Sequence, residues 1–599
     1  MVATGDMALG RNLHKLLPED DFDRQPIVGG GGRYLLVADA RIDNRRELAA
    51  ELNIVAKEAS GMSDAALVMA AWERWQLASH DKMLGDFAVG VWDAHEQALT
   101  LLRSAFAQKP LFYHVHPHFT AFATMPVGLH SLPGIPKRLH FQNAATIAGQ
   151  FAYLGSSTVF DGIRQVRHGH AVRLKGQREE IICLLDLTKV TEFKRTADHA
   201  EALRLELDRA VSAQLRRHRG PAASHLSSGR DSSAVTTSAA CVLATQGQEL
   251  VAFTGAPGAD FRGPTYAGRL SDESELAAKT AALHNNVRHL VCRPESSSTV
   301  SLLKTMSALH HGPLGNIANM HWWAKINEEA SLRGCQVMLI GSTGNLSISS
   351  GGVQYLRDLL LQEGAGQWFR KALSLGRGSP SAWRSIANVT WGPILPHSIH
   401  SFALKATGRG RGTSLEAPIL RPPYRQKTEA FLHEQWADSR PPKSYFEYRR
   451  NLLLLRDNPD KMSLACWGID PRDPTSDRRL VQLSLSIPAE QLVSGPSSRP
   501  LFEAAFQDRI PSEVLHSGRR GYQGADWYEH FRKQEVEAAF RTYRRNPIVG
   551  ELLDLGYVDG LIDVWPVRDW NQPDVLRNFR NPLLRALALA SFIDAHFPD

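Results

Sequence analysis

The segment from Leu226 to Ser232 reads Leu-Ser-Ser-Gly-Arg-Asp-Ser and combines residue types that can bind a phosphate chain. A short apolar strand is expected to end at Leu226, and the small residues after it allow a tight turn before a helix that begins near Ser232. The backbone N–H groups of such a turn and the positive end of the helix dipole point to one place, which suits a pyrophosphate. Asp231 could hold Mg²⁺ between phosphate oxygens, or it could be an ordinary helix cap in a Ser/Gly turn.

Other phosphate-binding loops are excluded or weaker. The chain contains no Gly-Lys pair, which excludes a Walker A loop. The glycine-rich runs at Gly29–Gly32 and around Gly408 do not follow a strand and open a helix. The segment around Asp231 is therefore the main candidate nucleotide site.

This segment resembles the S-G-G-x-D-S signature of the ATP pyrophosphatases, with Ser228 in place of one glycine. Further segments follow in the order found in the asparagine synthetase family. They are Val251–Gly255, Asp272–Glu273, Val337–Asn345, Asp470–Asp477 and Arg519–Gly521. Over about 300 residues, the C-terminal part of the chain thus resembles the synthetase of that family.

The resemblance implies a role for each matched position. Leu226, Thr254, Ile340 and Gly341 would line the adenosine, and Arg519 would steady the reacting intermediate. The pyrophosphate of ATP and its Mg²⁺ would be held by Ser227, Ser228, Gly229, Asp231 and Ser232. Asp231 and Arg519 are thus the expected catalytic residues, Asp231 and Asn345 the expected metal ligands, and ATP and Mg²⁺ the expected cofactors.

Two of these positions depart from the family pattern. Asn345 replaces the second metal carboxylate, which predicts weaker metal binding unless another acid compensates. A loop residue that tolerates a left-handed turn is the alternative interpretation of Asn345. Arg519 replaces a lysine, which keeps a permanent cation but loses any role for a deprotonated amine.

The N-terminal part resembles a different module, the glutamine amidotransferase domain that precedes the synthetase in this family. The matching segments are 37–48, 85–93 and 108–115. That domain requires Cys directly after Met1, whereas Val2 stands here, and Ser104 and Ala107 replace a usual Asp and Gly. We therefore expect a degenerate domain without glutaminase activity, with no first strand before residue 33 and with Arg41 and Asp86 as ordinary strand-end and turn residues.

The order of expected elements indicates an α/β protein with two domains, 1–190 and 191–599. Residues 33–125 are strand-rich with one strong helix in 63–75. From 221 onward strands and helices alternate, which predicts a parallel sheet covered by helices. The chain after 341 is expected to be mainly helical, with 408–423 as a loop. The resemblance implies an Ntn-type αββα fold for the first domain and an adenine nucleotide α-hydrolase-like fold with a helical extension for the second.

Composition limits the classes of protein. A chain of 599 residues with 43% apolar and 22% charged residues is long enough for more than one globular core and is not mainly disordered. The net charge of +7 is too dilute to indicate nucleic acid. No signal-like or transmembrane segment and no disulfide framework among the five cysteines is evident, so we expect a cytoplasmic protein without a membrane or nucleic-acid partner.

The expected function is ATP-dependent amide-bond formation through an acyl-adenylate. The degenerate amidotransferase part, the Gly-Ser-Thr-Gly-Asn loop and segment 519–527 most resemble the lasso peptide cyclases of proteobacteria. The resemblance implies a precursor peptide as substrate, its Asp or Glu side chain joined to its N-terminal amine, and a leader-processing peptidase as partner. An asparagine synthetase that uses free ammonia and an inactive nucleotide-binding scaffold are the alternatives.

Overall fold

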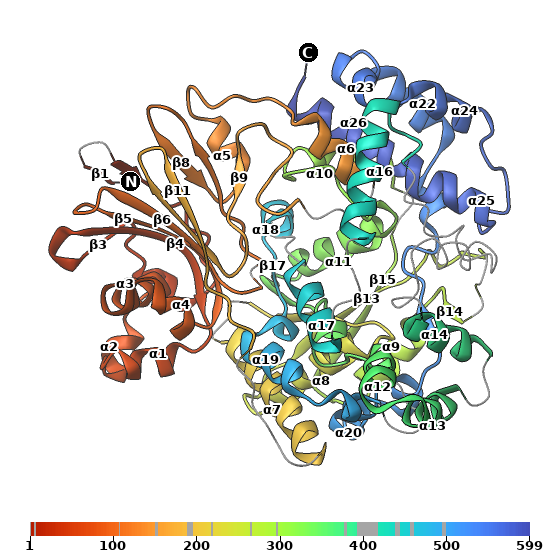
Figure 1. Ribbon diagram of the computed structural model, residues 1–599, viewed down its shortest axis with the longest axis horizontal. Coiled ribbons are helices and arrows are strands. Elements are labelled where there is room, and N and C mark those ends of the chain that lie inside the picture. Colours follow the sequence, from red (N-terminus) through yellow and green to blue (C-terminus); the bar gives the residue numbers. More distant parts are fainter. Residues whose placement is uncertain are drawn as a thin grey trace.

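A computed structural model describes residues 2–4, 7–106, 108–149, 154–188, 196–216, 220–263, 266, 268–294, 297–376, 380–391, 417–437, 444–455, 461–493 and 499–598. The chain forms two halves that lie side by side (Figure 1). The domain boundary expected near 190 and most of the loop expected at 408–423 lie outside the described residues. Within these ranges no helix is both long and apolar enough to cross a membrane.

The N-terminal half is built on a six-stranded antiparallel sheet of order β11-β10-β6-β5-β4-β3. Its strands are β3 (Ile27–Gly29), β4 (Tyr34–Ile42), β5 (Gly85–Asp93), β6 (Ala98–Arg103), β10 (His170–Lys175) and β11 (Arg178–Cys183). A three-stranded sheet contains β7 (Phe112–Val115), β8 (Thr120–Ala123) and β9 (Arg164–Gln165). The helices are α1 (Arg45–Glu51), α2 (Ala56–Ser60), α3 (Asp64–Trp75), α4 (Ser79–Lys82), α5 (Pro126–His130) and α6 (Phe141–Gly149).

Side-chain alternation in β5 assigns the two faces of the large sheet. Val89 and Val91 pack with Leu67 of α3, whereas Ala88 packs with Tyr113 of the small sheet. The outer face of the small sheet is covered by α5 and, from the other half of the chain, by α26 (Leu584–His596). The layers therefore run helix, sheet, sheet, helix, and the last layer is shared with the C-terminal half.

The expectation of no strand before residue 33 is wrong. Besides β3, a hairpin is formed by β1 (Val2–Thr4) and β2 (Met7–Leu9), which pair only with each other. These strands are too short to show the alternation from which a strand can be recognised in sequence. The strong helix at 63–75 is confirmed as α3, whose N-cap Ser63 accepts a hydrogen bond from the Ala66 backbone N–H.

The C-terminal half contains the expected parallel sheet, of order β15-β13-β12-β16-β17. Its strands are β12 (Ala222–His225), β13 (Leu250–Gly255), β15 (Val287–Cys292), β16 (Val337–Leu339) and β17 (Asp470–Arg472). The helices up to β16 are α7 (Thr196–Gln214), α8 (Arg230–Ala244), α9 (Ser274–Ala281), α10 (Thr299–Ser307) and α11 (Met320–Leu332). The parallel order places the carboxyl ends of all five strands, and the loops that follow them, at one edge.

The remainder is mainly helical, as expected. Its helices are α12 (Leu356–Glu363), α13 (Ala365–Gly376), α14 (Pro380–Trp391), α16 (Pro422–Ala437), α17 (Tyr445–Leu454), α18 (Met462–Trp467), α19 (Arg478–Ser486), α20 (Pro500–Phe506), α21 (Ser512–Leu515), α22 (Lys533–Tyr543), α23 (Pro547–Leu552), α24 (Leu555–Asp563), α25 (Pro573–Val575) and α26. Two strands interrupt it. β17 closes the parallel sheet, and β18 (Arg520–Gly521) pairs with β14 (Arg269–Leu270).

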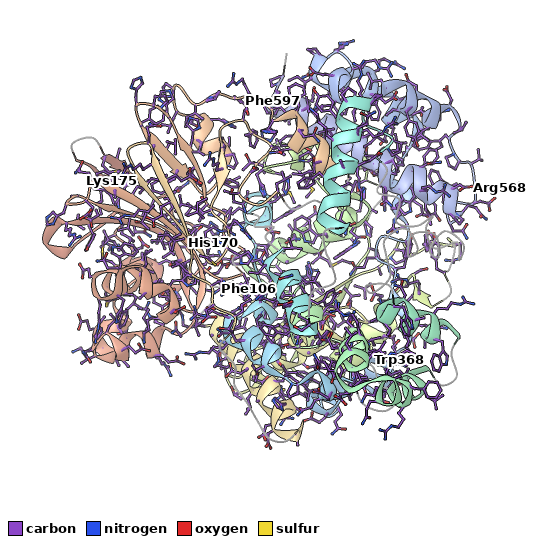
Figure 2. All side chains as sticks on the ribbon, in the orientation of Figure 1. Phe106, His170, Lys175, Trp368, Arg568 and Phe597 are labelled. Atoms are coloured by element: carbon purple, nitrogen blue, oxygen red, sulfur yellow. The ribbon has the colours of Figure 1, made fainter. Side chains whose placement is uncertain are left out.

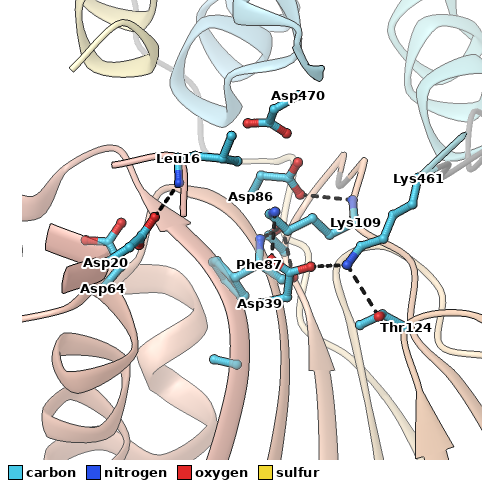
Figure 3. Close-up of polar contacts among 12 residues, drawn as sticks. Leu16, Asp20, Asp39, Asp64, Asp86, Phe87, Lys109, Thr124, Lys461 and Asp470 are labelled. Atoms are coloured by element: carbon cyan, nitrogen blue, oxygen red, sulfur yellow. Dashed lines mark hydrogen bonds and ion pairs between the residues drawn. The ribbon is translucent and has the colours of Figure 1, made fainter. Parts of the chain in front are cut away.

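The two halves meet along a packed and charged seam. Phe106 of the N-terminal half packs with Leu453 and Val481, and Figure 2 shows it where the halves meet. Asp39 of β4 accepts hydrogen bonds from Lys109 (2.8 Å) and, across the seam, from Lys461 (Figure 3). It also accepts one from Arg11 at 3.2 Å. Burial alone would raise the pKa of Asp39, but the three cations outweigh it and hold that pKa well below its ordinary value.

Replacing Asp39 by Asn should destabilise the protein by about 3–5 kcal/mol, because it removes the buried carboxylate that bonds both Lys109 and Lys461. The free energy of unfolding in urea measures this. Asp39 stabilises the fold above its unfolded pKa, and that contribution is lost as pH falls through the lower folded pKa. The free energy of unfolding of the variant should therefore decline less steeply with falling pH than that of the unmodified protein. Asp21→Asn is the control, since the Lys15–Asp21 pair is exposed and its loss should cost no more than about 1 kcal/mol. Equal effects of the two variants would show that the seam does not depend on Asp39.

Candidate active site

The loop after β12 turns into α8 at the carboxyl edge of the parallel sheet. Gly229 is the N-cap of α8, with extended backbone, so the helix begins at Arg230 and not near Ser232. Among the described residues, nothing accepts a hydrogen bond from the backbone N–H groups of Arg230, Asp231 and Ser232, as expected for the first turn of a helix. This turn faces a cleft lined by Ser227, Gly229, Asp231 and Ser232. Three free N–H donors and the helix dipole therefore point to one place, as an anion requires.

Asp231 is not the cap of α8, which removes the ordinary structural interpretation of this residue. Its Oδ1 atom is buried and has no hydrogen-bond partner among the described residues. Burial raises its pKa to about 6, although Ser349 and Arg499 act in the opposite direction. A buried carboxylate oxygen without a partner is costly unless something binds it, and a Mg²⁺ ion with phosphate oxygens would do so.

Side-chain bonds fix the shape of the loop. The hydroxyl groups of Ser227 and Ser232 lie 2.8 Å apart, and the Gly229 backbone N–H donates to Ser227 Oγ at 3.0 Å. Ser228 behaves differently from the expectation. Its hydroxyl and its backbone N–H both donate to Glu273 Oε1, at 2.5 and 3.1 Å. Because both donors are used, Ser228 does not offer them to a phosphate, and its expected role as a pyrophosphate ligand is corrected to anchoring the loop.

The adenosine side of the cleft agrees with the expectation for three of four residues. Leu226, Ile340 and Gly341 line it, together with Phe253 and Gly255 of β13. Thr254 is buried and does not line it. Its hydroxyl donates to the Leu226 carbonyl at 2.7 Å and lies 2.8 Å from His289 Nε2. Successive strand residues point to opposite faces, so Thr254 supports Leu226 from behind while its two neighbours face the cleft.

His225 and Trp322 were not identified from the sequence. Both line the same cleft, their rings lie 6.0 Å apart, and the buried atoms His225 Nε2 and Trp322 Nε1 have no hydrogen-bond partner among the described residues. Burial lowers the pKa of His225 to about 4, so its ring is neutral at pH 7. A lone His before the loop and a Trp on a distant helix carry no sequence signal that joins them.

The loop after β16 closes the cleft against α8. A Cβ on Gly344 would collide with Asp231, and one on Gly341 would come within 3.0 Å of its backbone. Asp473 holds this loop, since its Oδ2 accepts from Ser342 Oγ and from the Thr343 backbone N–H, both at 2.8 Å. Its Oδ1 accepts from Thr475. Four of the five further matched segments, all except Arg519–Gly521, thus meet at the loop that contains Asp231.

Asn345 lies in the short 3₁₀ turn Gly344–Leu346 and faces Arg499. Its Oδ1 accepts a hydrogen bond from Arg499 Nη2 at 3.1 Å, and Arg499 Nη1 donates to Ser349 Oγ at 3.0 Å. The carboxylate of Asp473 already accepts hydrogen bonds from Ser342, Thr343 and Thr475. Among the described residues, the charged group that reaches Asn345 is therefore a cation and not a compensating acid, and the predicted weaker metal binding at this position stays a prediction.

Arg519 is exposed, and its guanidinium makes no hydrogen bond or ion pair with a described residue. It lines a second cleft of about 510 Å³ with Arg499 and Arg520. The first cleft measures about 580 Å³, and Gly229, Asp231 and Asn345 line both. The two clefts therefore meet at Asp231, with the nucleotide-sized cleft on one side and the arginines on the other.

This arrangement fits ATP with one Mg²⁺ ion. The free N–H groups of α8 suit phosphate oxygens, and the unpartnered Oδ1 of Asp231 suits the metal. A second Mg²⁺ does not fit at Asn345, because the oxygen that would bind it already accepts from a guanidinium. Among the described residues there is also no group of three or more His, Cys, Asp or Glu that could hold a metal by themselves.

The seam contains a smaller pocket at two of the positions that resemble the amidotransferase domain. Arg41 and Asp86 line it together with Arg472 and Asp477 of the other half, and none of the five cysteines does. Arg41 is paired with Asp43 at 2.8 Å. Burial raises the pKa of Asp86, which also accepts from the Lys109 backbone N–H at 3.2 Å. Arg41 and Asp86 lie at strand ends, as expected, near the end of β4 and the start of β5, and in addition both are buried in the seam.

Asp231→Asn should abolish Mg·ATP binding while leaving the fold intact or more stable. The folded pKa of about 6 lies above the ordinary value of 3.8, so Asp231 favours folding at low pH and this contribution is lost as pH rises through 6. At pH 7 the amide should therefore raise the free energy of unfolding by about 1–3 kcal/mol. In the unmodified protein, Mg·ATP affinity should fall as pH falls through about 6, because the metal needs the carboxylate. Calorimetric titrations at several pH values and thermal melting check both points. A large loss of stability with ATP binding retained would make Asp231 structural.

Comparisons with known proteins agree with this geometry. A family model described as Asparagine synthase matches residues 202–576, and one described as Glutamine amidotransferase domain matches residues 1–182. Amidase chry2 of Gibberella zeae is 27% identical over 322 residues, which are 52% of this chain and 46% of that protein. Asparagine synthetase [glutamine-hydrolyzing] 3 of Bacillus subtilis is 27% identical over 236 residues, 38% of each chain. The chain thus spans less than half the length of these curated relatives.

Among solved structures, the glutamine phosphoribosylpyrophosphate amidotransferase of B. subtilis, complexed with ADP and GMP, is similar over 53% of this chain and 73% of its own. Its sequence identity is 10% and its TM-score 0.20, which is too low to carry an argument. The family model, by contrast, covers more than half of the chain and includes every site residue named above in the C-terminal half. The chain therefore belongs to the asparagine synthase family and carries a glutamine amidotransferase-type domain in its N-terminal half.

Proposed function

We propose that this protein is an ATP-dependent ligase that activates a carboxylate as an acyl-adenylate and transfers the acyl group to an amine. The observation that carries the proposal is the unpartnered, buried Oδ1 of Asp231 at the start of α8, where two clefts meet. The proposal includes that the C-terminal domain binds the nucleotide in the manner of adenine nucleotide α-hydrolases.

In the proposed reaction, a carboxylate oxygen attacks the α-phosphorus of ATP and the bond to the β-phosphate breaks, so that pyrophosphate leaves. An amine nitrogen then attacks the acyl carbon, AMP leaves with the bonding electrons, and the nitrogen gives up a proton. Mg²⁺ held by Asp231 would offset charge on the phosphate oxygens. The N–H groups of α8 orient the phosphates, and Arg519 meets the negative charge that grows as the adenylate forms.

A peptide is the substrate class that we propose. The two clefts measure about 510 and 580 Å³, each within the range of about 300–1,000 Å³ that is common for small-molecule sites, and they join at Asp231. One cleft can hold a nucleotide while the other admits the reacting end of a peptide. Holding the Asp or Glu side chain of a precursor peptide near its own N-terminal amine would make ring closure effectively unimolecular. This is the reaction of a lasso peptide cyclase, with a leader-processing peptidase as the proposed partner.

We further propose that the amine does not come from glutamine hydrolysed by this chain. A glutamine amidotransferase domain is present, and hydrolysis there needs a nucleophile. The pocket that contains Arg41 and Asp86 has no cysteine among its lining residues, and β1 pairs only with β2 instead of entering the large sheet. Free ammonia or a peptide amine remains as acceptor.

The substrate can be tested by isotope exchange between pyrophosphate and ATP. With Mg²⁺ present, exchange should require a leaderless peptide that has Gly or Ala first and an acid seven or eight positions later. Free aspartate with ammonia should not support it. Mass spectrometry should find a product lighter than the peptide by one water. Exchange with aspartate would favour an asparagine synthetase, no exchange with any acid would favour an inactive scaffold, and amide hydrolysis without ATP would favour an amidase. Release of glutamate from glutamine would contradict the proposal for the N-terminal domain.

Arg519→Ala should lower kcat by about 10²- to 10³-fold and leave the KM for ATP nearly unchanged, because the guanidinium meets charge that exists mainly in the transition state. Arg519→Lys should recover part of the rate, since it restores a cation but not the planar donor. Arg520→Ala is the matched comparison from the same cleft and should affect ATP affinity more than kcat. A raised KM with unchanged kcat for Arg519→Ala would make Arg519 a ground-state ligand.

A further inference from the structure

Asn345 and Arg499 form a pair that the family pattern does not contain. Asn345 stands where the resemblance implies a second metal carboxylate, and Arg499 precedes α20, 154 positions later in the chain. The guanidinium bridges Asn345 Oδ1 (3.1 Å) and Ser349 Oγ (3.0 Å) on the loop that packs against Asp231. Arg499 is half-buried and lines the second cleft.

The second cleft is rich in arginines. It is lined by Arg230, Arg449, Arg499, Arg519 and Arg520, whereas Asp231 is the only carboxylate among its described lining residues. Burial lowers the pKa of Arg499, and the nearby guanidiniums of Arg230 and Arg520 lower it further, against the attraction of Asp231. Arg449 donates to the Ser484 and Leu346 carbonyls, and Arg230 donates to the Leu515 carbonyl. Among the described lining residues, cations thus outnumber carboxylates, which favours an anion.

A neutral amide and a guanidinium disfavour a second metal ion, whereas two carboxylates would attract one. Two carboxylates attract a second divalent cation, and that cation then binds phosphate oxygens. Here one carboxylate is absent, and a permanent cation already lies at the same place, with planar donors that suit phosphate oxygens. A divalent ion at Asn345 would meet repulsion from Arg499 and an oxygen that is already in use.

We propose that Arg499, fixed by Asn345 and Ser349, takes the place of a second magnesium ion and binds the phosphates that leave as pyrophosphate. The inference rests on the proposed binding of ATP at Asp231, but not on the identity of the acyl substrate. It makes the enzyme a one-metal ligase. Asn345 then acts as a positioning residue whose side-chain oxygen holds the guanidinium.

Counting metal ions on the nucleotide complex tests the proposal without turnover. The probes are Mn²⁺ in place of Mg²⁺, measured by electron paramagnetic resonance, and α,β-methylene-ATP, which cannot be cleaved at the bond that adenylation breaks. The unmodified chain should bind one Mn²⁺ per nucleotide. Asn345→Asp combined with Arg499→Ala should bind two, because it restores the carboxylate and removes the opposing cation. Asn345→Asp alone should still bind one, since the new carboxylate would pair with Arg499.

Nucleotide affinity gives the second readout. Arg499→Ala should weaken binding by about 10- to 100-fold, which is the loss expected for charge-assisted hydrogen bonds to phosphate. Arg499→Lys should lose less nucleotide affinity than Arg499→Ala, because it keeps the positive charge. The control is Arg544→Ala, because Arg544 forms an exposed pair with Asp559 at 2.7 Å, away from the cleft. Thermal melting verifies that each variant folds.

Two Mn²⁺ ions on the unmodified chain, or unchanged nucleotide affinity in folded Arg499→Ala, would overturn the inference. Failure of every variant and of the unmodified chain to bind nucleotide would overturn the proposed function, and this inference with it. One Mn²⁺ per nucleotide without exchange on any peptide would support the inference and reject only the proposed substrate.

Discussion

The site depends on one close approach, that of the loop 341–344 to the first turn of α8. Gly341 and Gly344 have no side chain where a Cβ would press on Asp231, so β16 and β12 can bring their two loops into contact. This contact buries the carboxylate, and burial raises its pKa. The same approach places Asn345 and Ser349 next to the arginine before α20. A site with a buried acid, free helix N–H groups and a guanidinium within reach therefore follows from the absence of two methyl groups.

The second constraint is the seam between the halves. Asp39 compensates cations from both halves, and Asp470, at the start of β17, pairs with Arg472 at 2.7 Å inside the same seam. Asp473 follows directly and holds Ser342 and Thr343. The charged seam thus directly adjoins, at Arg472, the residue that shapes the loop beside Asp231. The N-terminal domain therefore contributes to the shape of the site through this segment.

The sequence was sufficient to predict many of the helices and strands, but it was insufficient to predict which side chains contact one another in the folded protein. Residues 85–93 and 98–103 are strands as expected, since their apolar patterns are long enough to read, and the alternation after 221 is a parallel sheet. The strands before residue 33 and β17 were missed because three residues are too few to show an apolar pattern. In the site, small residues and an acid after a strand identified Leu226, Gly229 and Asp231. The errors at Ser228 and Thr254 have another cause, because their hydroxyl groups bond to Glu273 and His289, which only tertiary structure brings near. Arg499 carried no local signal at all.

In the C-terminal half, Ser228 and Asn345 depart from the family pattern, and the side chain of each has a hydrogen-bond partner. This argues against a loss of function in that half. Ser228 replaces a glycine and gains a bond to buried Glu273. Asn345 replaces an acid and gains Arg499. Ser342 donates to Asp473, which keeps every atom of that carboxylate in use. Random loss of function would leave buried polar atoms unsatisfied at such positions, and each would cost about 1–3 kcal/mol. Among these residues the buried oxygen left without a partner is that of Asp231, the one atom for which a ligand outside the protein is the natural partner.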